Sequence, residues 1–335
     1  PSKAYVGYRD ASSIDPSLTR ARVQMQVITR RAHAWQEAID GLKAIAEEVP
    51  DYAPTYRELA ETYRAWALVA TKTEDYNERN RQGVEYYKQY MDKTDYSVES
   101  RIRYADFLVY AKDYDELQKQ AAELARLEDV NPKILRYLGY SAYKKGEYQQ
   151  SKEALDRMFT RMEAERIIPQ DHLHMGLVNV KLAGNDDALF EKGLADLKKA
   201  VAADSTIADD LHDVGIDVFT NSKQYARAQK IFDIPASTPS ARNYIYDNFY
   251  VGLAGYYAVA SKPADQRGGP ENEAILRRAD EAFALVIEKA PNTKDAYLHR
   301  GNINKLLDHS ENPKGLAIPH LEKFIELVKA DGDAE

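Results

Sequence analysis

The amino-acid sequence predicts an all-α protein, an α-α superhelix of about eight antiparallel helix pairs. Three observations lead to this prediction. Apolar residues recur at helical spacing along almost the whole chain, prolines separate the helical stretches, and a pattern of small and aromatic residues repeats along the sequence. No segment alternates between apolar and polar residues for long enough to predict a strand.

Prolines mark where the helices are expected to end, because proline lacks a backbone N–H and disrupts a helix interior. We expect every one of them to fall between helices. The positions are Pro50, Pro132, Pro169, Pro235, Pro239, Pro263, Pro270, Pro291 and Pro313.

A short pattern recurs in the first helix of each expected pair. In residues 53–70, Tyr56 is followed by Leu59, the small residue Ala60 and then Tyr63. Related patterns occur in 132–155, 250–257 and 297–304. The small residues lie 34 to 47 residues apart, at Ala60, Ala105, Gly139, Gly176, Gly215, Ala254 and Gly301. A period close to this range with helix–turn–helix content is typical of helical repeats.

The second helix of each pair carries its own signal. Ala38 and Leu42 precede Pro50, and Ala279 and Phe283 precede Pro291. A small residue on the first helix lets the second approach closely, and large residues fill the groove between pairs. One pair cannot bury its apolar face alone, so several pairs must stack.

These features resemble the tetratricopeptide repeat family over residues 17–330. The resemblance implies a single right-handed solenoid domain in which the first helix of each pair lines a concave surface. The sequence departs from the family at Arg300, where leucine is usual, and in inserted segments expected to form loops. These segments lie near 71–79, 163–169, 261–272 and 308–314. An irregular bundle of amphipathic helices is the alternative.

The two ends are expected to differ from the interior. Residues 1–16 show no clear period and predict an irregular N-terminal arm. The last helix, 316–330, places Leu321, Phe324 and Ile325 on one face and charged residues elsewhere, as the terminal repeat of a solenoid requires. Residues 331–335 are expected to form a tail.

The composition disfavours several classes of protein. The net charge of −8 would repel a phosphate backbone, so we expect no nucleic-acid partner. No apolar run is long enough for a transmembrane segment. The chain has no cysteine, which excludes thiolate zinc sites and cysteine nucleophiles, and slightly favours a periplasmic or secreted location over the cytoplasm. The chain begins at Pro1, so we expect that a preceding segment was removed.

No motif points to catalysis, so we expect no enzyme activity, no cofactor and no metal. The sequence lacks a P-loop, a dinucleotide glycine fingerprint and a zinc-protease motif. His172 and His174 lie two residues apart, which places them on different helix faces. Asp209, Asp213 and Asp217 form a row that we interpret as a solvated helix face, with cation binding as the alternative.

The resemblance implies that a ligand would lie against the first helices. Side chains one face away from the leucine and small-residue positions are expected to line a peptide-binding groove. The candidates are Arg57, Glu61, Arg64, Asp106, Arg136, Tyr140, Tyr143, His212 and Asn302. Arg and Tyr are enriched at binding hot spots. The alternative is that Tyr140 and Tyr143 only pad the inner wall.

We therefore expect a non-catalytic, monomeric scaffold that binds a protein or peptide segment in the concave groove. Chaperone-binding members of the family clamp a terminal carboxylate with paired lysines and asparagines, which the expected inward positions here lack. One alternative is a cell-envelope accessory, or a helical-repeat lipoprotein that binds a small ligand or glycan. A second alternative is an enzyme with an unrecognised site.

Overall fold

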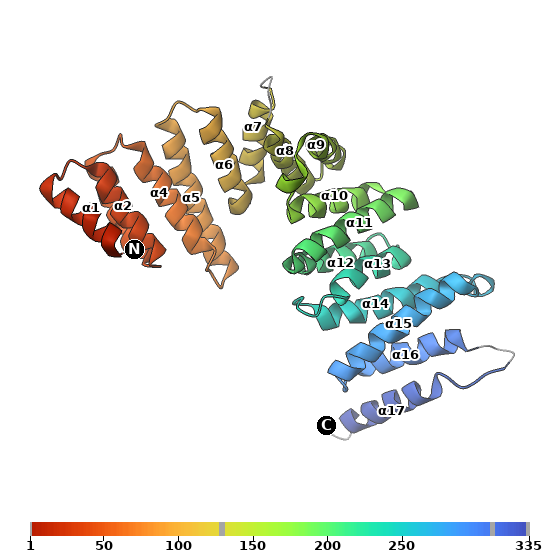
Figure 1. Cartoon of the computed structure of the whole chain (residues 1–335). Coiled ribbons are helices and arrows are strands. Elements are labelled where there is room, and N and C mark those ends of the chain that lie inside the picture. Colours follow the sequence, from red (N-terminus) through yellow and green to blue (C-terminus); the bar gives the residue numbers. More distant parts are fainter. Residues whose placement is uncertain (1, 127–130, 309–311, 333–335) are drawn as a thin grey trace. The chain divides into compact units, whose positions relative to one another are not determined.

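The computed structural model describes residues 2–126, 131–308 and 312–332, which contain seventeen α-helices, three short 3-10 helices and no strand (Figure 1). The all-α prediction is therefore confirmed for these residues. The chain divides into two compact units, Pro1–Ala164 and Glu165–Glu335. The boundary lies inside 17–330, which the sequence analysis treated as one domain. Among the described helices, none combines the length and apolar character that crossing a bilayer requires.

The first unit contains nine helices that follow one another as antiparallel neighbours. They are α1 (Ser2–Ile14), α2 (Thr19–Arg31), α3 (Trp35–Glu48), α4 (Ala53–Ala67), α5 (Thr73–Asp92), α6 (Val98–Ala111), α7 (Tyr114–Leu124), α8 (Pro132–Lys144) and α9 (Tyr148–Arg161). The short helix η1 (Ala164–Arg166) follows α9.

The second unit contains eight α-helices and two short 3-10 helices. They are α10 (Pro169–Leu182), α11 (Asp187–Ala203), η2 (Ser205–Asp210), α12 (Leu211–Thr220), α13 (Tyr225–Ala236), α14 (Tyr244–Ala260), η3 (Ala264–Gln266), α15 (Pro270–Lys289), α16 (Lys294–Leu307) and α17 (Ile318–Gly332).

Helices α2 to α17 form eight consecutive pairs, in agreement with the predicted number. The partners within each pair pack on each other, from α2 with α3 to α16 with α17. First helices of neighbouring pairs also touch, as α2 does with α4, α6 with α8 and α14 with α16. This alternation is the repeat that the sequence predicts.

Small residues on the first helices explain the close approach within pairs. A Cβ added at Gly139 would lie 2.6 Å from the Leu155 side chain, and one at Gly215 would lie 2.5 Å from the Phe232 ring. Large residues of the second helix thus occupy the space that glycine leaves open. In α14 an added Cβ at Gly252 would lie 2.4 Å from the Phe283 ring, and the predicted small residue Ala254, two positions later, is fully buried.

The departure from the family pattern at Arg300 has a local cause. Its Nε donates to Oδ1 of Asp280 at 2.9 Å, and Asn304 donates to the same oxygen at 2.6 Å. Asp280 on α15 therefore binds two side chains of α16. An ion pair takes the place of the apolar contact that a leucine would make.

The expected irregular arm at 1–16 is wrong, because residues 2–14 form helix α1. This helix packs on α2. Its apolar residues are largely exposed, with Val6 41% and Ile14 87% accessible. A helix with so little buried surface shows only weak hydrophobic periodicity in its sequence. It ends just before Asp15, the residue that precedes Pro16, where proline disfavours helical backbone.

The structure shows only some of the loops expected at the inserted segments and only some of the helix ends expected at the prolines. Residues 73–79 belong to α5, so the segment 71–79 is mostly helix. The segments 163–169 and 261–272 contain η1 and η3 and end in the first turns of α10 and α15. Residues 309–311 of the segment 308–314 lie outside the described residues. Pro132, Pro169 and Pro270 each open a helix, as expected, but Pro235 lies within α13.

The last helix runs to Gly332, so residues 331 and 332 of the tail expected at 331–335 are helical, and residues 333–335 lie outside the described residues. Leu321 packs against Gly301 of α16. Ile325 and Val328 are 49% and 44% exposed, so the apolar face of α17 is only partly covered.

Candidate functional site

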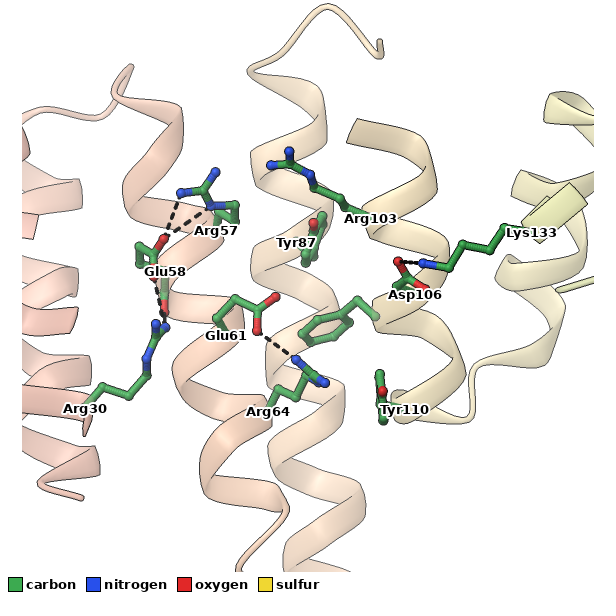
Figure 2. Close-up of a pocket in the computed structure, with 11 residues that line it drawn as sticks. Arg30, Arg57, Glu58, Glu61, Arg64, Tyr87, Arg103, Asp106, Tyr110 and Lys133 are labelled. Carbon is green, nitrogen blue, oxygen red and sulfur yellow. Dashed lines mark hydrogen bonds and ion pairs between the residues drawn. The ribbon is translucent and has the colours of Figure 1, made fainter. Parts of the chain in front are cut away.

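A pocket of about 590 Å³ lies in the first unit, where first helices of four consecutive pairs come together. Figure 2 shows its side chains converging from facing helices. The lining comes from α2, α4, α5, α6 and α8: Arg30, Arg57, Glu58, Glu61, Arg64, Tyr87, Arg103, Asp106, Phe107, Tyr110 and Lys133. We call this set the arginine pocket.

One end of the arginine pocket is organised around Glu58 of α4. This carboxylate is 7% exposed and lies between two guanidinium groups. Arg57 donates to its Oε1 from Nη2 at 2.9 Å and from Nε at 3.3 Å, and Nη1 of Arg30 lies 3.0 Å from its Oε2. The carboxylate of Glu58 therefore pairs with both guanidinium groups, and the three side chains together carry one net positive charge.

Arg64 lies about two helical turns after Arg57, on the same face of α4. Its Nη1 donates to Oε2 of Glu61 at 3.1 Å, and its guanidinium stacks over the Tyr110 ring of α6 at 4.0 Å from the centroid. The buried Nε of Arg64 has no hydrogen-bond partner in the described part of the chain. The stack holds the guanidinium in place while leaving donor capacity unused.

The far side of the pocket carries Asp106 and Arg103 of α6. Asp106 forms an ion pair with Lys133 of α8 and accepts a short hydrogen bond from the buried Tyr137 hydroxyl. Arg103 lies 3.0 Å from Glu99, one turn away on the same helix and mostly in water. Salt and solvent weaken such an exposed pair. Glu99 therefore neutralises little of the positive charge of Arg103.

Tyr87 of α5 forms part of the pocket floor, and its side chain is only 1% exposed. Its ring stacks on Tyr104 at 5.1 Å and contacts Phe107 at 5.0 Å between centroids. Burial, followed by the negative charge of Glu61, raises the pKa of the Tyr87 hydroxyl, so it stays protonated at neutral pH. The positive charges of Arg57 and Arg103 oppose that rise.

The pocket differs in charge from the rest of the protein. Five basic side chains line it against three carboxylates, a surplus of two positive charges in a chain of net charge −8. Aromatic rings lie among these charges. The arrangement suits a ligand that carries negative charge next to apolar groups.

The structure brings together four of the nine predicted groove residues: Arg57, Glu61, Arg64 and Asp106. Arg136 and Tyr140 of α8 are 7% and 4% exposed, so both residues are buried and do not form an open surface. Tyr143 packs beside Tyr148 at 5.5 Å between ring centroids, which agrees with the wall-padding alternative.

The two remaining candidates lie in the second unit. His212 Nδ1 is 2.7 Å from Oδ1 of the buried Asp247, and the histidine ring contacts Phe232 and Tyr250. Burial raises the pKa of Asp247, and the hydrogen bond to His212 opposes this rise. Asn302 is half-buried in α16. Neither residue lines the arginine pocket.

The other polar clusters of the sequence have structural partners. Lys181 donates to Asp217 at 2.5 Å and lowers the pKa of that carboxyl, and Asp209 accepts from the Arg242 backbone N–H at 2.7 Å. His172 Nδ1 lies 3.3 Å from Asp196. Within the described residues, no three His, Asp or Glu side chains converge as metal ligands would.

The sequence analysis missed the pocket residues Arg30, Glu58, Arg103, Phe107, Tyr87 and Tyr110. Arg30 occupies in α2 the place that Arg64 has in α4, so extending the repeat to the degenerate first pair would have found it. Tyr87 belongs to a second helix, on which no groove residue was sought.

No protein-family model matches the sequence, and no curated protein matches it significantly. Among solved structures, the chain is similar to the C-terminal part of a TPR repeat-containing protein from Cytophaga hutchinsonii. The identity is 22%, the match covers 69% of this chain and 80% of that one, and the TM-score is 0.42.

YrrB, a TPR protein with an unusual peptide-binding site, is 16% identical over 73% of this chain and 93% of its own, with a TM-score of 0.33. A human IFIT1 dimer with PPP-AAAA is 12% identical over 92% and 73%, with a TM-score of 0.43.

The packing within each of the two units is that of a tetratricopeptide-like helical-repeat fold. Successive antiparallel pairs, glycines facing large second-helix residues, and contacts between neighbouring first helices all occur in it. The resemblance seen in the sequence is thus confirmed at the level of the fold. An origin in a cell envelope stays a prediction.

Proposed function

We propose that the protein is a non-catalytic interaction scaffold that binds an acidic segment of a partner protein in the arginine pocket. The observation that carries the proposal is the surplus of two positive charges in a pocket lined by successive first helices. Such a surface presents side chains from several repeats to one extended guest, which is how stacked repeats form binding surfaces.

The chemistry of the lining supports a protein guest. Arg64 on Tyr110 and Arg57 near Tyr90 are held in place by rings, at 4.0 and 5.9 Å from the ring centroids. Arginine and tyrosine lose little conformational freedom when they are already packed, so binding through them costs less entropy. The phenyl ring of Phe107 offers an apolar contact beside the charges.

A peptide-display selection tests the proposal directly. We expect a library of random short peptides, panned on the full chain, to be enriched in Asp and Glu. The double variant Arg57→Gln with Arg64→Gln should weaken the selected peptides at least tenfold, since hydrogen bonds between charged groups are worth about 1.5–3 kcal/mol.

The matched control is Arg81→Gln with Arg277→Gln. Both arginines are exposed and pair with a glutamate on their own helix, at 2.7 and 2.5 Å. Neither lines the pocket. Equal loss of binding in the control and the pocket variant would mean that net charge, and not the pocket, holds the peptide, and the proposal would be wrong.

A further inference from the structure

The Tyr87 hydroxyl is an unused donor at the floor of the arginine pocket. Its ring is 1% exposed and fixed between Tyr104 and Phe107. No hydrogen bond to the hydroxyl occurs among the described residues, although Tyr87 lines the pocket. The hydroxyl is not among the fully buried polar atoms that lack a partner, so it faces the pocket, where water or a ligand can accept its hydrogen bond.

Two guanidinium groups act on this hydroxyl from opposite helices. Arg57 comes from α4 and Arg103 from α6, and both charges are close enough to affect the ionisation of Tyr87. In Figure 2 the two arginines extend from facing helices into the same end of the pocket. The three side chains therefore offer donors to one place from three different helices.

The two arginines also retain donor capacity. Arg57 uses Nε and Nη2 on a single oxygen of Glu58, and its Nη1 has no partner in the part of the chain that the structure describes. Among the described residues, Arg103 bonds only Glu99, and their side chains are 51% and 72% exposed. Because Glu58 is shared with Arg30, its charge does not neutralise Arg57 fully.

We propose that Tyr87, Arg57 and Arg103 form a subsite for a phosphoryl group on a phosphorylated side chain of the guest segment. This inference rests on the proposed function and names the group that the pocket recognises. The guanidinium groups would bind the phosphoryl oxygens, and the Tyr87 hydroxyl would donate to another of them.

A phosphoryl monoester fits this subsite better than a carboxylate does. It carries a charge of about −1.5 to −2 at neutral pH and three acceptor oxygens. The pocket has a surplus of two positive charges and three donor groups on different helices. A carboxylate would neutralise half of that charge and has two oxygens for three donor groups. Arginine also matches phosphate geometry through paired N–H groups.

The test uses the full chain and three peptide libraries that differ only at a fixed central residue. That residue is phosphoserine, glutamate or serine. The best phosphoserine peptide is then made in all three forms, and its affinity is measured by fluorescence anisotropy. We expect the phosphoserine form to bind at least tenfold more tightly than the glutamate form, as the larger charge predicts.

Tyr87→Phe is the sharpest variant, because it removes one oxygen that has no hydrogen-bond partner among the described residues and keeps the packed ring. We expect it to weaken the phosphoserine peptide about ten- to a hundredfold, the value of one hydrogen bond to a charged group. The glutamate and serine forms should bind as they do to the unmodified chain. Arg103→Gln should act in the same direction, and Arg81→Gln should have no effect.

The outcomes separate the two proposals. If acidic peptides bind through Arg57 and Arg64 while phosphoserine gives no gain and Tyr87→Phe has no effect, the phosphoryl subsite is wrong and the scaffold function stands. If no peptide form binds, both are wrong. Competition by inorganic phosphate at millimolar concentration supports the subsite. Stronger competition by a 5′-phosphorylated oligonucleotide than by the phosphopeptide would overturn it in favour of a nucleic-acid guest.

Discussion

The central carbon of the Arg64 guanidinium on α4 lies over the ring of Tyr110 on α6, 4.0 Å from the ring centroid. This contact joins two neighbouring repeats across the arginine pocket. Tyr110 is 46% exposed, so its removal should not disturb the core. The contact therefore orders the pocket more than it stabilises the fold.

Replacing Tyr110 with leucine should release Arg64 and weaken acidic peptides about two- to fivefold, the range for an exposed cation–π contact. The thermal midpoint should stay within the error of the measurement. Calorimetric titration with a display-selected peptide measures the first value, and circular dichroism measures the second. An unchanged affinity would show that the stack does not position Arg64 for binding.

Glu58 is expected to stabilise the fold and to oppose the binding of anionic peptides. Glu58→Gln leaves Arg30 and Arg57 without their shared carboxylate and increases the positive surplus of the pocket. We expect a loss of roughly 1–2 kcal/mol in unfolding free energy, less than for a fully buried pair because both arginines are partly exposed. Anionic peptides should bind more tightly, with a steeper dependence on salt. Weaker binding by this variant would mean that Glu58 positions Arg57 instead of competing with the guest.

Gly215 tests the packing that sets the distance between paired helices. Gly215→Ala would place a Cβ 2.5 Å from the Phe232 ring, and overpacking of this kind costs about 1–3 kcal/mol. Higher helix propensity offsets at most about 1 kcal/mol of that cost.

Gly7→Ala is the matched control for Gly215→Ala, because Gly7 also lies in a helix and nothing lies within 4 Å of an added Cβ. Urea denaturation should show destabilisation for the first variant and a gain of about 0.5–1 kcal/mol for the second. Similar effects of the two substitutions would refute the spacing role of Gly215.

The sequence predicts the repeat well because the repeat is local. Proline at the start of α8 and Gly139 opposite Leu155 follow from short-range patterns. The pocket depends on which helices become neighbours in space. Spacing along α4 alone identifies Arg57 and Arg64, whereas Tyr87 and Arg103 join them only after α5 packs against α4 and α6 packs against α5.

Two errors have the same physical origin. Arg136 and Tyr140 are at the right helical spacing for the groove, yet both residues are buried. Helix α1 was missed because its apolar residues are mostly exposed and produce little periodicity. The exposure of these side chains depends on how helices pack in space, so the sequence of a single helix does not predict it.

His299 should make the stability of the second unit depend on pH. Its ring stacks on Phe283 at 5.8 Å between centroids, and its buried Nδ1 has no partner among the described residues. Burial lowers the pKa of this histidine, and the carboxylate of Asp295 opposes the shift. The unfolded chain therefore takes up the proton more readily than the folded chain.

The contribution of His299 is thus present above its ordinary pKa of 6.5 and is lost as the pH falls from there towards the lowered folded value. Unfolding free energy from urea titrations should decrease between neutral pH and about pH 5. His299→Phe keeps an aromatic ring at this site and should show a smaller decrease. An identical pH profile for the variant would assign the acid sensitivity to other groups, such as His320, whose pKa burial also lowers.

The principal helix contacts join elements that are one or two places apart along the chain. Within either unit, then, no late stretch of sequence has to return and close the structure. Under a pulling force we expect each unit to unfold one helix pair at a time, because the stability of stacked repeats is roughly a sum over repeats and nearest-neighbour interfaces. The same property lets a hairpin be duplicated or lost during evolution while those two places away keep their internal packing.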